Sequence, residues 1–260
     1  MSDLLQAVVL GIVEGLTEFL PVSSTGHLLI AEHWLGRRSE LFNVAIQAGA
    51  ILAAVVVFWP RISQLLFGLG ARENRDYLAK LLFAFSISAA GGLAAKKLGV
   101  VLPETVAPIA GALLVGGLLI LLIEWRVSGR ALVSAVSWPV AFWVGAAQIV
   151  AAVFPGTSRS AATIFAAMLA GLTSRPAATE FAFLVGIPTM FAATGYEFIG
   201  LRGTASAEVD WSALALAFAV AAVVAFAAVK WLLRYVQTHR FTVFAWYRIA
   251  AGLLLLLVAR

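Results

Sequence analysis

Long apolar runs separated by short polar segments make up most of the chain. Most of the runs approach the roughly 20 residues that an α-helix needs to cross a bilayer. The pattern therefore predicts an all-α, polytopic integral membrane protein with about ten helical segments and no appended soluble domain. The runs cover residues 4–20, 24–36, 43–59, 78–96 and 106–124 in the first half, and residues 136–154, 160–172, 180–200, 212–233 and 243–259 in the second.

Two of these runs, 24–36 and 160–172, are short, and each follows a break that contains a proline. Because proline disfavours the helical conformation of the residue before it, Pro21 and Pro155 should each end a helix. We expect each short run to form a re-entrant hairpin with the run before it, which leaves about six full crossings. The N-caps expected for the short helices are Ser23 or Ser24 in the first break and Thr157 or Ser158 in the second.

The two breaks also match each other along the chain. Because each half contains an odd number of crossings, the second half should enter the membrane from the opposite face. We therefore predict one membrane domain, residues 1–260, built as an inverted-topology repeat of residues 1–130 and 131–260, with the breaks meeting near the midplane. A shift of 134 residues superposes Gly11 on Gly145, Glu14 on Gln148, Pro21 on Pro155 and the pair Ser23-Ser24 on Thr157-Ser158.

Composition agrees with a membrane protein and excludes some chemistry. The chain is 62% hydrophobic and only 12% charged, whereas soluble domains carry about 25% charged residues. It contains no cysteine, so disulfides and thiolate metal sites are excluded. The net charge of +5 is modest and is expected to report membrane orientation rather than a nucleic-acid partner. The start of the chain lacks a basic segment before its first apolar run, so no cleavable signal peptide is expected.

The lysines and arginines between the runs predict the orientation. Cytoplasmic loops carry an excess of these residues, so the side with ten should face the cytoplasm and the side with six should face outward, together with both termini. The first hairpin would then enter from the outer face. The ten are Arg61, Arg72, Arg75, Lys80, Arg126, Arg130, Arg175, Lys230, Arg234 and Arg240, and the six are Arg37, Arg38, Lys96, Lys97, Arg202 and Arg260.

Two carboxylates stand in the first apolar run. Glu14 and Glu18 are four residues apart and share one helix face. Two carboxylates in a low dielectric repel each other, so a divalent cation, a basic side chain or a shared proton must resolve the pair. Mg²⁺ or Ca²⁺ would suit them, because hard cations combine carboxylates with substrate phosphate oxygens. The alternative is a structural pair or a proton relay in a transporter.

Hydroxyls, one imidazole and one guanidinium follow the breaks. Ser24 and His27 are three residues apart, so the imidazole can lie near the hydroxyl. A serine with a histidine within reach is the minimum for an activated oxygen nucleophile, although an N-cap serine followed by a buried histidine has the same spacing. Arg159 lies between apolar segments, where it cannot easily reach an interface, and helix N-termini and arginine both bind phosphate. The other candidate ligands of a phosphate are Ser23, Thr25, Gly26, Gly156, Thr157, Ser158 and Ser160. The whole set is expected to bind a phosphate group whose remainder is lipid.

The same residues resemble a known family. The run EGLTEFLPVSSTGH at 14–27 and the run PGTSRSAATI at 155–164 are similar to the two signatures of the bacterial undecaprenyl-diphosphate phosphatases of the bacitracin-resistance type. Residues 42–53 and 180–188 resemble the helices that flank those signatures. One position departs from the family, which usually has glycine where this chain has Ala161.

The resemblance implies a multi-pass enzyme of the bacterial inner membrane that removes the terminal phosphate of undecaprenyl diphosphate on the outer face. The product, undecaprenyl phosphate, is the lipid carrier that peptidoglycan synthesis reuses. It also implies a divalent cation, Mg²⁺ or Ca²⁺, an inverted-repeat fold with re-entrant helices, Glu14 and Glu18 as the paired acids, Ser24 and His27 as the active-site pair, and Arg159 as the phosphate ligand.

The sequence leaves three questions open. Ser24 attacks or positions the terminal phosphorus while His27 passes the proton, or His27 itself attacks and forms a phosphohistidine. The fold is also that of secondary transporters, so a lipid-phosphate flippase is an alternative function. A phosphatase with a second catalytic histidine is disfavoured, because the chain has three histidines and His239 lies in a basic loop. The expected partners are the polyprenyl diphosphate and membrane lipids, with a homodimer as a further option.

Overall fold

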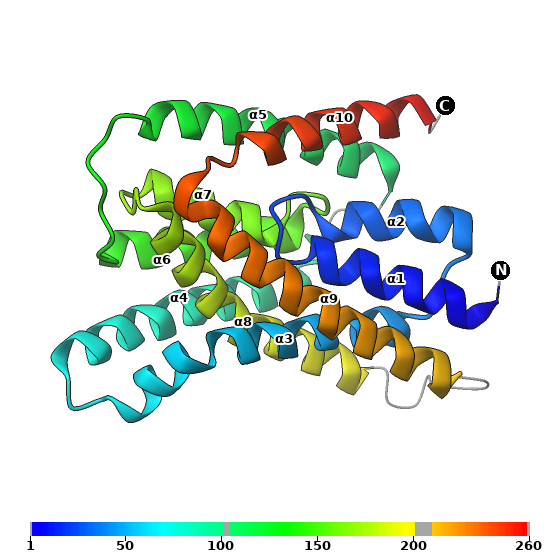
Figure 1. The fold of residues 1–260 in the computed structure, drawn as a ribbon, viewed down its shortest axis with the longest axis horizontal. Coiled ribbons are helices and arrows are strands. Elements are labelled where there is room, and N and C mark those ends of the chain that lie inside the picture. Colours follow the sequence, from blue (N-terminus) through cyan, green and yellow to red (C-terminus); the bar gives the residue numbers. More distant parts are fainter. Residues whose placement is uncertain (1, 101–104, 201–209, 259–260) are drawn as a thin grey trace.

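The computed structural model describes residues 2–100, 105–200 and 210–258. Within these ranges every regular element is a helix (Figure 1), which confirms the all-α prediction. Five helices, α3, α4, α5, α8 and α9, are long and apolar enough to cross a membrane. The helices are α1 (Asp3–Thr17), α2 (Ser24–Leu35), α3 (Glu40–Phe67), α4 (Arg72–Lys97), α5 (Val106–Val127), α6 (Trp138–Val153), α7 (Arg159–Leu169), α8 (Arg175–Gly200), α9 (Trp211–Thr238) and α10 (Thr242–Val258).

The sixth expected crossing is the last helix. α10 has 17 residues, which gives a length of about 25 Å, somewhat less than the roughly 30 Å of a hydrocarbon core. It lies along α5 (Figure 1), and α5 is itself long enough to cross. Gly117 allows this packing, because a Cβ there would lie 2.8 Å from the Ala245 carbonyl oxygen of α10.

Two helical hairpins enter the bundle from opposite ends. Figure 1 shows α1 and α2 entering from the end that carries both termini, whereas α6 and α7 enter from the end that carries the α3–α4 connection. Each hairpin turns inside the bundle at the break that contains Pro21 or Pro155. Backbone without helical hydrogen bonds is tolerated at such depth only when protein or a wet cavity surrounds it.

The hairpins pack alike, as an inverted repeat requires. α1 packs on α9, and α6 packs on α4. A Cβ at Gly11 would lie 2.6 Å from the Ala217 carbonyl oxygen, and a Cβ at Gly145 would lie 2.6 Å from the Ala84 carbonyl oxygen. The same residue type thus lets each hairpin approach its neighbour at equivalent positions, with the predicted shift of 134 residues between Gly11 and Gly145.

Each of the two breaks ends in a capping serine with positive φ, but the predicted alignment of these serines is wrong by one residue. Ser23 has φ 76° and accepts a hydrogen bond from the Gly26 amide, while Ser158 has φ 69° and accepts one from the Ala161 amide. Ser23 therefore corresponds to Ser158 and not to Thr157. The second break is one residue longer, so the shift becomes 135 after the prolines, and Ser24 corresponds to Arg159.

Candidate functional site

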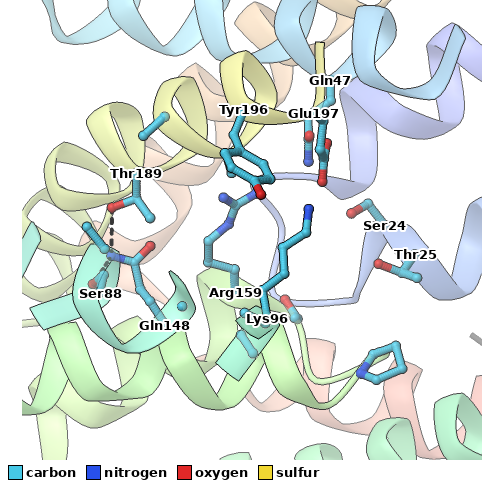
Figure 2. A pocket seen from close by; sticks show the side chains of 18 of the residues that line it. Ser24, Thr25, Gln47, Ser88, Lys96, Gln148, Arg159, Thr189, Tyr196 and Glu197 are labelled. Atoms are coloured by element: carbon cyan, nitrogen blue, oxygen red, sulfur yellow. Dashed lines mark hydrogen bonds between the residues drawn. The ribbon is translucent and has the colours of Figure 1, made fainter. Parts of the chain in front are cut away.

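A cavity of about 560 Å³ lies where the two breaks meet. Its lining begins at the first turn of α2 and the second break, and it continues along α4 and α8 to Lys96, Tyr196 and Glu197. Figure 2 shows the hydroxyls of Ser24 and Thr25 pointing into this space beside the Arg159 side chain. The cavity therefore runs from the middle of the bundle towards the end of the molecule that carries both chain termini.

Glu18 joins the two halves of the chain inside this cavity. The Ser24 hydroxyl donates to its Oε2 over 2.6 Å, and Arg159 Nη2 donates to its Oε1 over 2.5 Å. Glu18 is the C-cap of α1, and the side chains of the carboxylate and the guanidinium are 5% and 24% exposed. An acid, a hydroxyl and a cation from two separate breaks thus meet at the wall of one cavity, and the basic side chain compensates the charge of Glu18.

Glu14 lies one turn before Glu18 on α1 and is buried. Its Oε2 has no hydrogen-bond partner in the described part of the protein. An orphaned buried carboxylate oxygen next to a second carboxylate suits a hard cation, which takes one or two carboxylates and completes its shell with water and substrate phosphate. In the described ranges no three acidic, histidine or cysteine side chains gather at one point, so the protein alone would not complete such a shell.

His27 does not lie where its spacing from Ser24 led us to expect. Its Nδ1 donates to the Ser23 carbonyl oxygen at 2.6 Å, and its Nε2 forms a hydrogen bond with the Tyr247 hydroxyl at 2.5 Å. The imidazole also stacks on the Tyr247 ring, with centroids 5.5 Å apart. Both ring nitrogens are therefore engaged away from the Ser24 hydroxyl, and His27 is absent from the cavity lining.

The other predicted phosphate ligands divide into two groups. Those that line the cavity are Ser23, Thr25, Gly156 and Ser158. The remainder have structural contacts: Gly26 donates its amide to the N-cap Ser23, the Thr157 amide donates to the Phe154 carbonyl, and the Ser160 hydroxyl donates to the Leu20 carbonyl across the two breaks at 2.9 Å.

Two polar features of the site were not predicted as functional. Gln148, which corresponds to Glu14, lines the cavity and donates to the hydroxyls of Ser88 and Thr189 at 3.0 and 3.2 Å (Figure 2). Arg248 of α10 is fully buried and donates to main-chain carbonyls of both breaks. The signal for Arg248 was a single charge inside the apolar run 243–259, of the kind that usually marks function in membrane helices.

The fold and the cavity define a polytopic membrane protein with a polar site at the meeting point of two re-entrant hairpins. A model of the family described as bacitracin resistance protein BacA matches residues 7–254. The chain therefore belongs to this family, and the resemblance seen in its two signatures is confirmed.

Curated relatives extend this assignment over nearly the whole chain. A protein of Rhizobium etli strain CFN 42 is 58% identical over 255 residues, which cover 98% of this chain and 96% of the relative. A protein of Stenotrophomonas maltophilia strain R551-3 is 58% identical over 259 residues, covering 99% and 98%, and one of Xanthomonas oryzae pv. oryzae strain PXO99A is 55% identical over 258 residues, covering 99% and 97%. All three are named undecaprenyl-diphosphatase.

Proposed function

We propose that this protein is an undecaprenyl-diphosphate phosphatase, a hydrolase that releases inorganic phosphate and returns undecaprenyl phosphate for cell-wall synthesis. The carrying observation is the meeting of Ser24 and Arg159 on Glu18 inside one cavity. A diphosphate needs a cation to bind it, an oxygen nucleophile and a proton acceptor, and these three groups supply them. The relatives are named for this chemistry, which favours the enzyme over the lipid-phosphate flippase.

The diphosphate is bound by the Arg159 guanidinium and by the N-terminus of α7, which follows the second break. Arg159 opens α7 and lines the cavity, so its guanidinium and the N-terminal end of this helix lie at the same space. Arginine binds phosphate oxygens through parallel donors, and a helix N-terminus adds its dipole. Thr25 and Ser158 line the same cavity with hydroxyls. The terminal phosphate would take the place of Glu18 on part of the guanidinium.

The Ser24 oxygen is the proposed nucleophile. Its proton already points at Glu18 Oε2, so the carboxylate accepts that proton as the oxygen attacks the terminal phosphorus. The bond from that phosphorus to the bridging oxygen breaks, and undecaprenyl phosphate leaves. Water then attacks the phosphorus of the phosphoserine, the bond from phosphorus to the Ser24 oxygen breaks, and Glu18 returns the proton to that oxygen as inorganic phosphate is released. This arrangement supports Ser24 over His27 as the attacking residue, because both nitrogens of His27 have other partners.

Glu14 and Glu18 are the residues that would hold Mg²⁺ or Ca²⁺. A bound divalent cation supplies neutralisation of the charge on the transferring phosphoryl group. The orphaned Oε2 of Glu14 supports this assignment. Chelation by EDTA should abolish turnover of the wild-type protein, and readdition of Mg²⁺ or Ca²⁺ should restore it. Glu14→Gln should require a higher cation concentration for half-maximal turnover, and an unchanged requirement would remove Glu14 from the cation site.

We also propose that the site faces the outer side of the bacterial inner membrane. The cavity lining runs towards Lys96 and Tyr196, which lie in the last turns of α4 and α8, and α8 ends on the side of the bundle that carries both termini (Figure 1). Among the described residues, that end carries Arg37, Arg38, Lys96 and Lys97, fewer lysines and arginines than the opposite end, which is typical of the non-cytoplasmic side. A membrane-impermeant probe should label an engineered cysteine at Lys97 in intact cells, because the native chain contains no cysteine; labelling only after lysis would reverse the orientation.

The direct test uses purified protein in detergent with undecaprenyl diphosphate and Mg²⁺. Release of inorganic phosphate by the wild type, and its loss in Ser24→Ala, is the expected result. If the wild type binds the lipid and releases no phosphate, the enzymatic proposal fails and the flippase takes its place.

A further inference from the structure

Arg248 is a buried cation whose described partners are all neutral. It is 0% exposed, the largest side chain among those fully buried. Nη1 donates to the Pro21 carbonyl at 3.3 Å, and Nη2 donates to the carbonyls of Gly156 and Ala112 at 3.2 and 2.9 Å. None of the salt bridges found among the described residues involves it. Burial of a charge is costly unless its donors are satisfied. The three carbonyls take up donors of Nη1 and Nη2, whereas Nε has no hydrogen-bond partner among the described residues.

The two breaks offer Arg248 equivalent acceptors. Pro21 precedes the N-cap Ser23 by two residues, and Gly156 precedes the N-cap Ser158 by two residues. Their carbonyl oxygens therefore occupy matching places in the two repeats. These carbonyls lie in non-helical backbone deep in the bundle, where an unpaired polar group is expensive. One guanidinium satisfies both of them and links the breaks directly, while its third bond ties them to α5.

We propose that Arg248 is a positioning residue that fixes the two breaks relative to each other, so that Ser24 and Arg159 meet at Glu18. The proposal rests on the phosphatase function proposed above. The nucleophile begins one hairpin helix and the phosphate ligand begins the other, and Arg248 of α10 hydrogen-bonds to the break that precedes each of them. A misplacement of reacting groups by about 1 Å can lower turnover about 100-fold. Weakening the hydrogen bonds from Arg248 to the two breaks should therefore lower turnover more than it lowers the stability of the fold.

Gly116 offers a way to move Arg248 without removing its charge. A Cβ at Gly116 would lie 2.8 Å from Arg248 Cζ, so an alanine there must displace the guanidinium, which is the flexible end of its side chain. Gly111 lies on the same helix, α5, and a Cβ there would meet no atom within 4 Å. Gly116→Ala and Gly111→Ala are therefore matched variants, since each adds one methyl group and the same helix propensity.

Two measurements on these variants decide the proposal. Steady-state kinetics with undecaprenyl diphosphate should show a tenfold to 100-fold lower kcat for Gly116→Ala with KM changed less than threefold, and wild-type values for Gly111→Ala. Hydrogen exchange followed by mass spectrometry should show faster exchange in Gly116→Ala at both breaks, residues 18–24 and 154–160, without a general increase elsewhere. The second measurement does not depend on activity.

Truncation with chemical rescue provides an independent variant. Arg248→Ala should lose turnover, and guanidinium at low millimolar concentration should restore it at least fivefold by filling the vacated space. The same addition should leave Gly111→Ala and the wild type unchanged. If Arg248→Ala does not fold, Gly116→Ala still decides the question, because it keeps every polar group of the site.

Three outcomes would overturn the proposal. The first is equal kcat and equal exchange in Gly116→Ala and Gly111→Ala. The second is wild-type kcat in folded Arg248→Ala. The third is a lower yield or melting temperature with unchanged kcat per folded molecule, which would make Arg248 merely structural. If the wild type itself releases no phosphate, the phosphatase function fails, and hydrogen exchange alone decides the positioning role.

Discussion

The pair of Glu18 and Arg159 predicts an asymmetric response to mutation. Arg159→Met would leave the Glu18 carboxylate, whose side chain is 5% exposed, without its cation. Loss of one partner from a buried pair costs about 3–5 kcal/mol, and because Ser24 still donates to this carboxylate, we expect a loss near 3 kcal/mol. Glu18→Gln would leave a guanidinium that is 24% exposed and lines the cavity, and we expect a loss of about 1 kcal/mol.

The double variant should lose less stability than the sum of the two single variants. With Glu18→Gln and Arg159→Met together no buried charge is left unpaired, so the double variant should be at least as stable as Arg159→Met alone. This corresponds to a coupling of about 1 kcal/mol or more between the two sites. Both single variants and the double variant should still lack turnover, since each removes a group that the proposed reaction needs.

Equilibrium unfolding in mixed micelles of dodecylmaltoside and sodium dodecyl sulfate would measure these free energies, with fluorescence of the eight tryptophans as the signal. The ion pair of Arg38 and Asp3 is the matched control, because the Asp3 side chain is 69% exposed and exposed pairs couple by less than about 1 kcal/mol. Additive losses at Glu18 and Arg159, or equal losses in the two single variants, would refute the reasoning.

Other predictions follow from single residues. Ser24→Ala should lower kcat at least 1,000-fold, by loss of the nucleophile, while lipid affinity stays within about threefold; a smaller loss of turnover would remove Ser24 as nucleophile. Gly156→Ala should destabilise the protein more than Gly36→Ala: both glycines have positive φ, 87° and 92°, but only at Gly156 would a Cβ meet backbone, 2.8 Å from Ile109 Cα. Thermal unfolding of the two variants in detergent would compare them, and equal losses would contradict the prediction. The Ser212 hydroxyl and the Ala213 amide hold the pKa of Asp210 below its usual value. The capping of α9 by the Asp210 carboxylate therefore contributes stability above about pH 4, and this stability is lost as the pH falls further. The difference in melting temperature between wild type and Asp210→Ala should shrink below about pH 4, and a difference that stays constant with pH would contradict the prediction.

The hydrophobic pattern predicted every helix, because lipid demands long apolar runs and breaks at membrane depth need special residues. It placed helix ends less well. The run 43–59 ends before Pro60, whereas α3 continues through Pro60 to Phe67. A proline interrupts a helix only where its missing donor and its ring cannot be accommodated, and local sequence does not report that. Pro21 and Pro155 do mark breaks, since capping serines follow them.

The site was harder to predict where it depends on contacts between distant segments. Helical spacing placed Ser24 and His27 on neighbouring turns, but their partners, Glu18 and Tyr247, decide which way each side chain points. The role of Arg248 depends on the crossing of α10 over both breaks, and no local pattern contains that information. The sequence alignment did not reveal the one-residue offset between the breaks, because serine or threonine occupies neighbouring positions in both breaks and either register pairs hydroxyl residues.

The offset explains why two similar hairpins make one site and not two. After the prolines Ser24 corresponds to Arg159, so one repeat supplies a nucleophile where the other supplies a cation. Before the prolines Glu14 corresponds to Gln148 and Glu18 to Ala152, so the second repeat lacks both acids. Both repeats keep a capping serine with positive φ at the turn of the hairpin, while the side chains that follow it, Ser24 and Arg159, differ and serve different roles in one site. Gln148→Glu would therefore restore one acid without its neighbour, and we expect it to create no second centre.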